Sequence, residues 1–271
     1  MVGRNIARFF KYAFLTIAAV LSVFPLYWMV VSSTNANPAI LRGSLIPGTN
    51  LFVNIQNLIA QQALGQAFIN SIVNALSVSV VSIIICSIAG YGFEIFHSKA
   101  KDRFMAFLLV SVMVPFAAVM IPLFSLVANM GLMNTTLGFM LPMLSSAFLI
   151  MLFRQSARAF PHEMIEAARV DGLSELSIFI RIFMPTMKAT YAAAFTIQFL
   201  ASWNTFLWPR LIMTPGASSI TMPMLLANLL SGYVTDFGVN MVAAFIASVP
   251  TIIVFFIMQR QFAQGIVGSV K

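Results

Sequence analysis

The sequence predicts an all-α polytopic membrane protein with six transmembrane helices and both termini in the cytoplasm. Of its 271 residues, 60% are hydrophobic and 8% are charged, whereas a soluble domain carries about 25% charged residues. Six apolar runs approach the roughly 20 residues that a helix needs to cross a bilayer. Because these runs use most of the length, we expect one membrane domain.

The six spans follow one another along the chain. The first begins after a basic N-terminus that mimics a signal peptide, but its apolar part of about 20 residues exceeds the roughly 7–15 of a signal-peptide core, so we expect it to be retained. A proline inside a span is expected to kink or end the helix; these are Pro25, Pro115, Pro122, Pro142 and Pro250. The predicted spans are approximately Tyr12–Ser33, Phe68–Phe96, Phe104–Ala128, Thr136–Arg154, Met187–Pro209 and Met241–Met258.

The basic residues orient these spans. With the N-terminus inside, thirteen of the fifteen lysines and arginines fall in cytoplasmic segments, and only Arg42 and Arg210 lie outside. The net charge of +8 is explained by basic loops beside anionic lipid, so we expect a lipid membrane and no nucleic acid as partner. Two long outer segments, Thr34–Ala67 and Met213–Asn240, either meet an extracytoplasmic partner or are plain connectors, and composition does not separate these alternatives.

Several kinds of site are missing from the sequence. No phosphate-binding Gly-x-x-x-x-Gly-Lys-Ser/Thr motif occurs, and the single cysteine and two histidines are too dispersed for a metal site. No acid lies near the middle of a span, which argues against proton coupling. Glu94 comes closest, at the cytoplasmic end of the second span, and it is expected to pair with its neighbours Lys99, Lys101 and Arg103.

Uncharged polar side chains recur in the second and fifth spans. Asn70 and Asn74 share a helix face, as do Gln198, Ser202 and Thr205, with Asn204 beside them. Such side chains can line a path for a neutral hydroxylated solute, or they can hydrogen-bond one packed helix to another. The spacing favours packing for any single residue and a path for the fifth-span group.

The stretch 166–185, EAARVDGLSELSIFIRIFMP, lies in a predicted cytoplasmic segment and holds three of the seven acids. Pro161 suits the first turn of a helix that ends at Asp171-Gly172. Ser174 can cap a second, amphipathic helix, which Pro185 is expected to end. The apolar face of that helix is predicted to be Leu176, Phe179, Ile180 and Phe183. This helix–turn–helix segment is either a docking element or an ordinary amphipathic loop.

The spacing within this stretch resembles the EAA motif of ABC importer permeases, in the form typical of carbohydrate uptake. The matching residues are Glu166, Ala167, Ala168, Asp171, Gly172, Phe179, Ile182 and Pro185. Trp203-Asn204 and Leu207-Trp208-Pro209 resemble the WNxxLxP pattern of that subfamily, and QRQFAQGIVGSVK resembles its tail. The chain departs from the pattern at Met184 and Ala189, where leucine and often proline are usual.

The resemblance implies a type I ABC importer permease fold. Residues 1–66 would form the N-terminal tail, first span and outer segment. Residues 67–259 would form the transmembrane domain with its loop at about 156–187, and residues 260–271 a cytoplasmic tail. Glu166, Ala167, Ala168, Asp171, Gly172 and Pro185 would couple this loop to an ATPase. The chain would be a transporter subunit rather than an enzyme.

The resemblance also implies partners in a bacterial or archaeal cytoplasmic membrane: a second homologous permease, two cytoplasmic ATPases and an extracytoplasmic solute-binding protein. ATP and magnesium would bind the ATPases, so no cofactor and no metal is expected in this chain. The expected cargo is a sugar or oligosaccharide. The alternatives are another polar solute such as a glycerol phosphodiester or a polyol, an ion-coupled secondary transporter, or a membrane scaffold that transports nothing.

Overall fold

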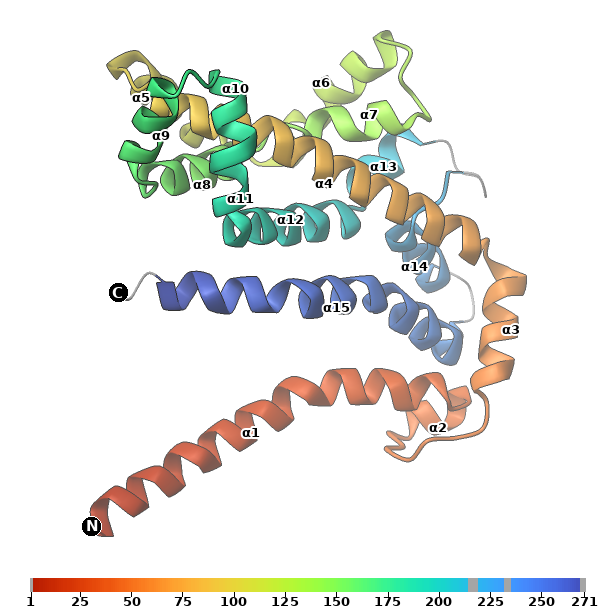
Figure 1. The fold of residues 1–271 in the computed structure, drawn as a ribbon. Coiled ribbons are helices and arrows are strands. Elements are labelled where there is room, and N and C mark those ends of the chain that lie inside the picture. The colour runs from red at the N-terminus through yellow and green to blue at the C-terminus, as the bar shows by residue number, and fades with distance from the viewer. Residues whose placement is uncertain (1, 214–218, 232–234, 269–271) are drawn as a thin grey trace. The chain divides into compact units, whose positions relative to one another are not determined.

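A computed structural model describes residues 2–213, 219–231 and 235–268. These residues form helices and connecting turns, and none of them is in a β-strand (Figure 1). Three helices are long and apolar enough to cross a membrane: α1 (Val2–Ser33), α4 (Leu64–Ile95) and α15 (Phe237–Gly268). The number rises to five if each of two sharply bent helix pairs counts as one span.

The first of these pairs replaces the predicted third span. Helices α5 (Lys99–Ser111) and α6 (Phe116–Asn129) meet at an angle of 100°. Pro115 precedes α6 with extended backbone angles, as expected of a residue that has no N–H to continue the preceding helix. The sequence predicted this span over about Phe104–Ala128 with Pro115 kinking or ending its helix, and the helical path does break just before this proline.

The second pair replaces the predicted fourth span. Helix α7 (Thr136–Met140) runs into the 3₁₀ turn η1 (Leu141–Met143), and α8 (Ala147–Arg158) follows at an angle of 54°. Pro142 lies in the 3₁₀ turn, and the Ser146 hydroxyl accepts a hydrogen bond from the Leu149 N–H to cap α8.

The predicted fifth span is also divided. Helix α12 (Lys188–Trp203) has 16 residues and ends at Asn204, and α13 (Leu207–Ile212) follows. By contrast, Pro25, Pro122 and Pro250 lie inside continuous helices, so these three prolines end no helix.

The chain divides into two compact units, which are described separately. One comprises residues 1–64 and 224–249, and the other comprises residues 65–223 and 250–271. Residues 214–218 and 232–234 of the second predicted outer segment lie outside the described residues, as do residues 269–271 of the predicted tail.

In the first unit, the predicted outer segment folds back on the end of α1. It contains α2 (Asn37–Leu41) and α3 (Leu51–Gln61). The buried Asn54 amide donates hydrogen bonds to the carbonyls of Ser33 and Asn35, at 2.9 and 3.0 Å. These bonds satisfy carbonyls at the C-terminus of α1 that would otherwise lack partners. The segment is thus a folded cap on α1, in addition to being a connector.

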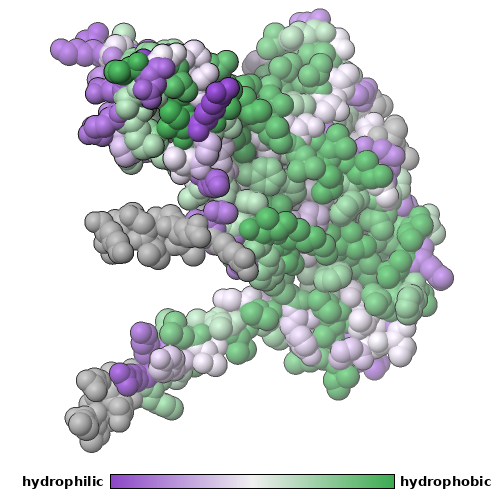
Figure 2. Space-filling model, in the orientation of Figure 1, coloured by the Kyte–Doolittle hydropathy of each residue, from purple (hydrophilic) through white to green (hydrophobic). Residues whose placement is uncertain are grey.

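The second unit contains the helices that carry the candidate site. In Figure 1, α5, α8 and α9 (His162–Val170) lie near one end of α4. Many large apolar side chains of this unit remain exposed, for example Phe107, Met113 and Ile121. Figure 2 shows hydrophobic residues over much of the molecule, with hydrophilic ones gathered over α5 and α9. Such extensive apolar exposure fits a surface covered by lipid or by other membrane helices.

Candidate functional site

The predicted cytoplasmic segment begins with a short helix that ends in a glycine turn. Helix α9 starts after Pro161, one residue later than predicted, and ends at Asp171. Gly172 has φ +79°. Its N–H donates to the carbonyl of Arg169, and the Leu173 N–H donates to that of Ala168, both at 3.0 Å. This pair of bonds forms a Schellman motif, which needs a residue in the left-handed region and favours glycine.

The second helix of the segment contains a widened turn. After α10 (Glu175–Ile178) the chain forms a π turn, η2 (Phe179–Phe183), and then α11 (Met184–Thr186). The hydroxyl of Ser174 accepts from the Ser177 N–H, so the predicted cap is present. Pro185 does not end the helical run, which continues to Thr186. The Met184 N–H bonds to the Phe179 carbonyl, five residues back, and this wider turn precedes a proline that has no N–H to donate.

The π turn also changes which side chains are buried. Phe179 and Phe183 are buried as predicted, but Leu176 and Ile180 are 65% and 51% exposed. Ile178 is buried instead, so the buried face of this helix is centred on Ile178 and Phe179 rather than on Leu176 and Ile180. The buried residues form a cluster with Tyr91 of α4 and with Phe160, Ile165 and Ala168. We call it the loop core.

Two alanine substitutions test this assignment. We expect Phe183→Ala to destabilise the protein by about 3–5 kcal/mol, because it opens a cavity in the loop core. Leu176→Ala removes an apolar side chain of similar type that is mostly exposed, and it should change stability by less than about 0.5 kcal/mol. Thermal unfolding in detergent would measure both, and equal losses would contradict the burial pattern.

Most of the predicted coupling residues are on the exposed side of this segment. Glu166, Ala167, Asp171, Gly172 and Pro185 are exposed. Ala168 is 5% exposed and packs in the loop core, so its small size serves packing within the chain.

Two exposed apolar residues were missed by the sequence reasoning. Met164 and Val170 are 44% and 87% exposed on α9. Val170 stands four residues after Glu166 and so shares its helix face, which was the available signal. Met164, two residues before Glu166, does not share that face. Val170, Glu166 and Ala167 are therefore exposed neighbours on α9, and they combine a carboxylate with small and apolar side chains.

An ion pair closes the turn between α9 and α10. The Arg169 Nε donates to a Glu175 carboxylate oxygen at 2.6 Å, and the hydroxyl of Tyr91 donates to the other oxygen at 3.5 Å. The hydrogen bond with Glu175 raises the pKa of Arg169 above its ordinary value, which favours the charged form of the arginine. Glu175 therefore fastens the turn and also contacts α4.

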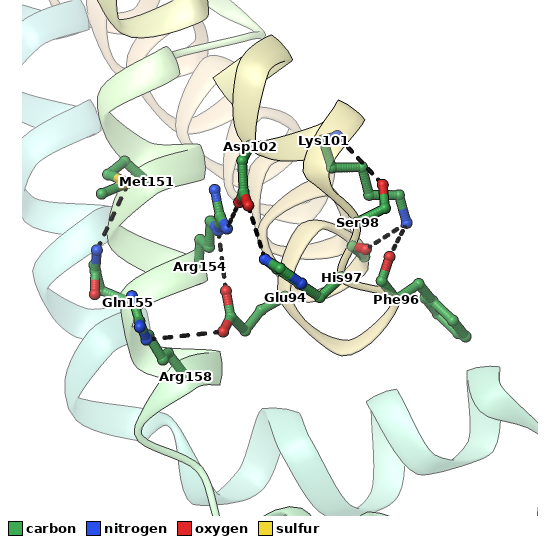
Figure 3. Close-up of polar contacts among 11 residues, drawn as sticks. Glu94, Phe96, His97, Ser98, Lys101, Asp102, Met151, Arg154, Gln155 and Arg158 are labelled. Carbon is green, nitrogen blue, oxygen red and sulfur yellow. Dashed lines mark hydrogen bonds and ion pairs between the residues drawn. The ribbon is translucent and has the colours of Figure 1, made fainter. Parts of the chain in front are cut away.

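A second charged cluster lies on α4, α5 and α8 (Figure 3). Arg154 points between two carboxylates: its Nε lies 3.0 Å from Glu94, and its terminal nitrogen bonds to Asp102. Arg158 approaches Glu94 at 4.0 Å, and His97 lies 2.9 Å from Asp102.

The expected partners of Glu94 were wrong. It pairs with Arg154 and Arg158, about sixty residues along the chain, and not with Lys99, Lys101 or Arg103. Lys101 instead donates to the carbonyls of Gly92 and Phe96, at 3.1 and 2.5 Å. These carbonyls lie at the C-terminal end of α4, where a cation is favourable.

Among the described residues, no group of three or more histidine, cysteine or acidic side chains is placed to hold a metal ion.

The polar residues of the second and fifth spans differ in their hydrogen bonds: two bond to other segments, and the others do not. The Gln198 amide donates to the carbonyl of Met143 at 3.0 Å, and that of Asn70 donates to the carbonyl of Ile220 at 2.9 Å. Both bonds join separate segments, as in helix packing. Asn204 is exposed and its amide bonds within α12, to the Leu200 carbonyl.

The remaining three residues of this group carry no such link. Asn74 is buried, and Thr205 is half-buried. Ser202 is 4% exposed, and its hydroxyl has no hydrogen-bond partner among the described residues.

Known proteins match this chain along nearly all of its length. The lactose transport system permease protein LacG of Rhizobium radiobacter is 46% identical, covering 99% of this chain and 98% of that protein. The arabinooligosaccharides transport system permease protein AraQ of Halalkalibacterium halodurans is 32% identical, over 93% and 92%. The sn-glycerol-3-phosphate transport system permease protein UgpE of Escherichia coli K12 is 30% identical, over 97% and 96%.

The fold and the family are matched as well. A chain in the crystal structure of a bacterial ABC transporter involved in the import of the acidic polysaccharide alginate superposes with a TM-score of 0.81. It is 20% identical and covers 95% of this chain and 97% of that one. The family model for the binding-protein-dependent transport system inner membrane component matches residues 95–268. The chain therefore belongs to this family of multi-pass membrane proteins, and it is a permease subunit of an ABC importer rather than an enzyme.

Proposed function

We propose that this chain, with a second homologous permease, forms the path by which a solute enters the cell, and that the loop at about 156–187 receives the force of ATP hydrolysis. Two cytoplasmic ATPases would bind ATP and magnesium, and an extracytoplasmic binding protein would deliver the solute. The observation that carries the proposal is the exposed surface of α9 and of the turn after it, which includes Glu166, Ala167 and Gly172. The buried side of α9 packs in the loop core, which holds the helix in place.

The proposed topology has six spans and cytoplasmic termini in a bacterial or archaeal cytoplasmic membrane. The two bent pairs would each count as one span, and α12 with α13 would complete the set. The distribution of basic residues supports this topology, because the alternative orientation places thirteen of fifteen outside. It also places α9 in the cytoplasm, where an ATPase can reach it.

The proposed cargo is a sugar or oligosaccharide. The names of two relatives, one for lactose and one for arabinooligosaccharides, support it. The relative named for sn-glycerol-3-phosphate favours a glycerol phosphodiester or similar solute as the second candidate. The path would be lined by Ser202, with its unpaired hydroxyl, and by Asn74, Asn204 and Thr205. Gln198 and Asn70 would lie beside this path, where their amide groups already bond to other parts of the chain.

Reconstitution in proteoliposomes tests both parts of the proposal. The complete complex should take up its solute when ATP is inside, and an ionophore that collapses ion gradients should not change the rate. Uptake that follows a proton or sodium gradient without ATP would show a secondary transporter instead. The cargo is tested by isothermal titration of the cognate binding protein with a disaccharide, a pentose oligosaccharide and a glycerol phosphodiester.

A further inference from the structure

We infer that the last turns of α4, residues 90–95, carry movement of the cytoplasmic loop into the membrane helices, with Glu94 and Tyr91 as the positioning residues. This inference rests on the proposed function, because it assumes that the loop is moved by an ATPase. The loop has two covalent connections to the membrane helices, α8 before it and α11–α12 after it. Residues of α8 and of the second half of the loop contact the same end of α4.

The contact on the α8 side is polar and enclosed. Arg154 of α8 and Glu94 of α4 each have 12% of their side-chain surface exposed, and their atoms lie 3.0 Å apart. A charged pair that is so little exposed resists separation, because either group alone would be left without a compensating charge. Only residues 159–161 separate α8 from α9. Because this connection is short, a shift of α9 should move the end of α8, and the Arg154 of α8 is bound to Glu94.

The backbones of α4 and α8 also approach closely beside this pair. A Cβ built on Gly90 would lie 2.7 Å from the backbone nitrogen of Arg154 and 2.8 Å from the carbonyl oxygen of Ile150. The two helices therefore touch where the ion pair joins them. Because packed interiors transmit displacement rather than absorb it, α4 should follow α8.

The contact on the α10–α12 side is aromatic. The Tyr91 ring is 4% exposed and lies 5.2 Å from the ring of Phe179 and 5.0 Å from that of Phe183. Its hydroxyl lies 3.5 Å from the Glu175 carboxylate, which also holds Arg169 at the end of α9. Tyr91 thus touches the second half of the loop, while Glu94, three residues on, holds the first half through Arg154.

The matched pair Glu94→Gln and Asp102→Asn separates this role from simple charge balance. Each substitution removes one carboxylate from Arg154, but Glu94 is on α4 and Asp102 is on α5. The measured quantity is the number of ATP molecules hydrolysed per solute transported by the assembled complex in proteoliposomes. We expect Glu94→Gln to raise this ratio by between about 2-fold and 30-fold, the range of coupling changes that single substitutions produce, and Asp102→Asn to leave it within 2-fold.

An unchanged ratio for Glu94→Gln would overturn the inference, and so would an equal rise for both variants. A purely structural role for Glu94 would lower the amount of assembled complex without changing the ratio. If Glu94→Gln fails to assemble, Glu94→Asp keeps the charge at a shorter reach, and the same outcomes decide. The proposed function is tested separately: if Glu166→Lys stops uptake while Glu94→Gln leaves the ratio unchanged, only this inference fails.

Discussion

Replacing Gly172 with valine is expected to abolish ATP-dependent uptake while the protein remains inserted in the membrane. The residue has φ +79°, and a β-branched side chain in that conformation costs about 1–3 kcal/mol. No described atom lies within 4 Å of a Cβ at this position, so the cost arises from backbone strain and not from a clash. The strain would open the Schellman turn and turn the exposed face of α9 away from its partner.

Two controls make the result specific. Gly172→Asn should retain most of the uptake, because asparagine tolerates the left-handed region. Gly131→Val introduces a similar strain elsewhere, since Gly131 has φ +70° and likewise no described atom within 4 Å of a Cβ. Uptake by right-side-out vesicles, normalised to the amount of complex, measures all three. Normal uptake by Gly172→Val and also by Glu166→Lys would contradict the assignment of the loop.

The loop shows which features a sequence can predict. Its first helix, its glycine turn and its Ser174 cap are local, because each depends on residues within one or two turns. The buried face of the second helix was predicted only in part, since its spacing assumed a regular α-helix. The π turn at Phe179–Phe183 departs from the 3.6-residue period, so a reading based on that period did not predict it.

The spans show a similar division. Apolar runs and prolines located the helices and two of their breaks, but not the angles of 100° and 54°.

The partners of Glu94 lie about sixty residues away, on a helix whose position depends on the whole fold. A prediction based on neighbours in the sequence therefore chose the wrong partners: Lys101 bonds to backbone carbonyls, and Lys99 and Arg103 are exposed. The sequence left open whether the polar residues of the second and fifth spans pack or line a path, and only the structure shows that Gln198 and Asn70 bond to other segments.

The close approach of α4 and α8 leads to the other large effect. Gly90→Ala should destabilise the protein by about 1–3 kcal/mol, and Gly90→Leu should prevent stable assembly. A Cβ at Gly90 would lie 2.6 Å from the Cβ of Phe153, 2.7 Å from the backbone nitrogen of Arg154 and 2.8 Å from the carbonyl oxygen of Ile150. None of these atoms can rotate away, so the two helices must separate.

Gly92→Ala is the matched control, two residues further along the same helix. No described atom lies within 4 Å of a Cβ at Gly92, and alanine is favoured over glycine in a helix interior by about 1 kcal/mol. This variant should unfold at the same temperature as the unaltered protein or at a slightly higher one. Thermal unfolding in detergent and co-purification of the ATPase would compare the three variants. If Gly90→Ala and Gly92→Ala were equally stable, α4 and α8 would not be in direct contact at Gly90. In that case the route from the loop to α4 would depend on the ion pair and the Tyr91 ring alone.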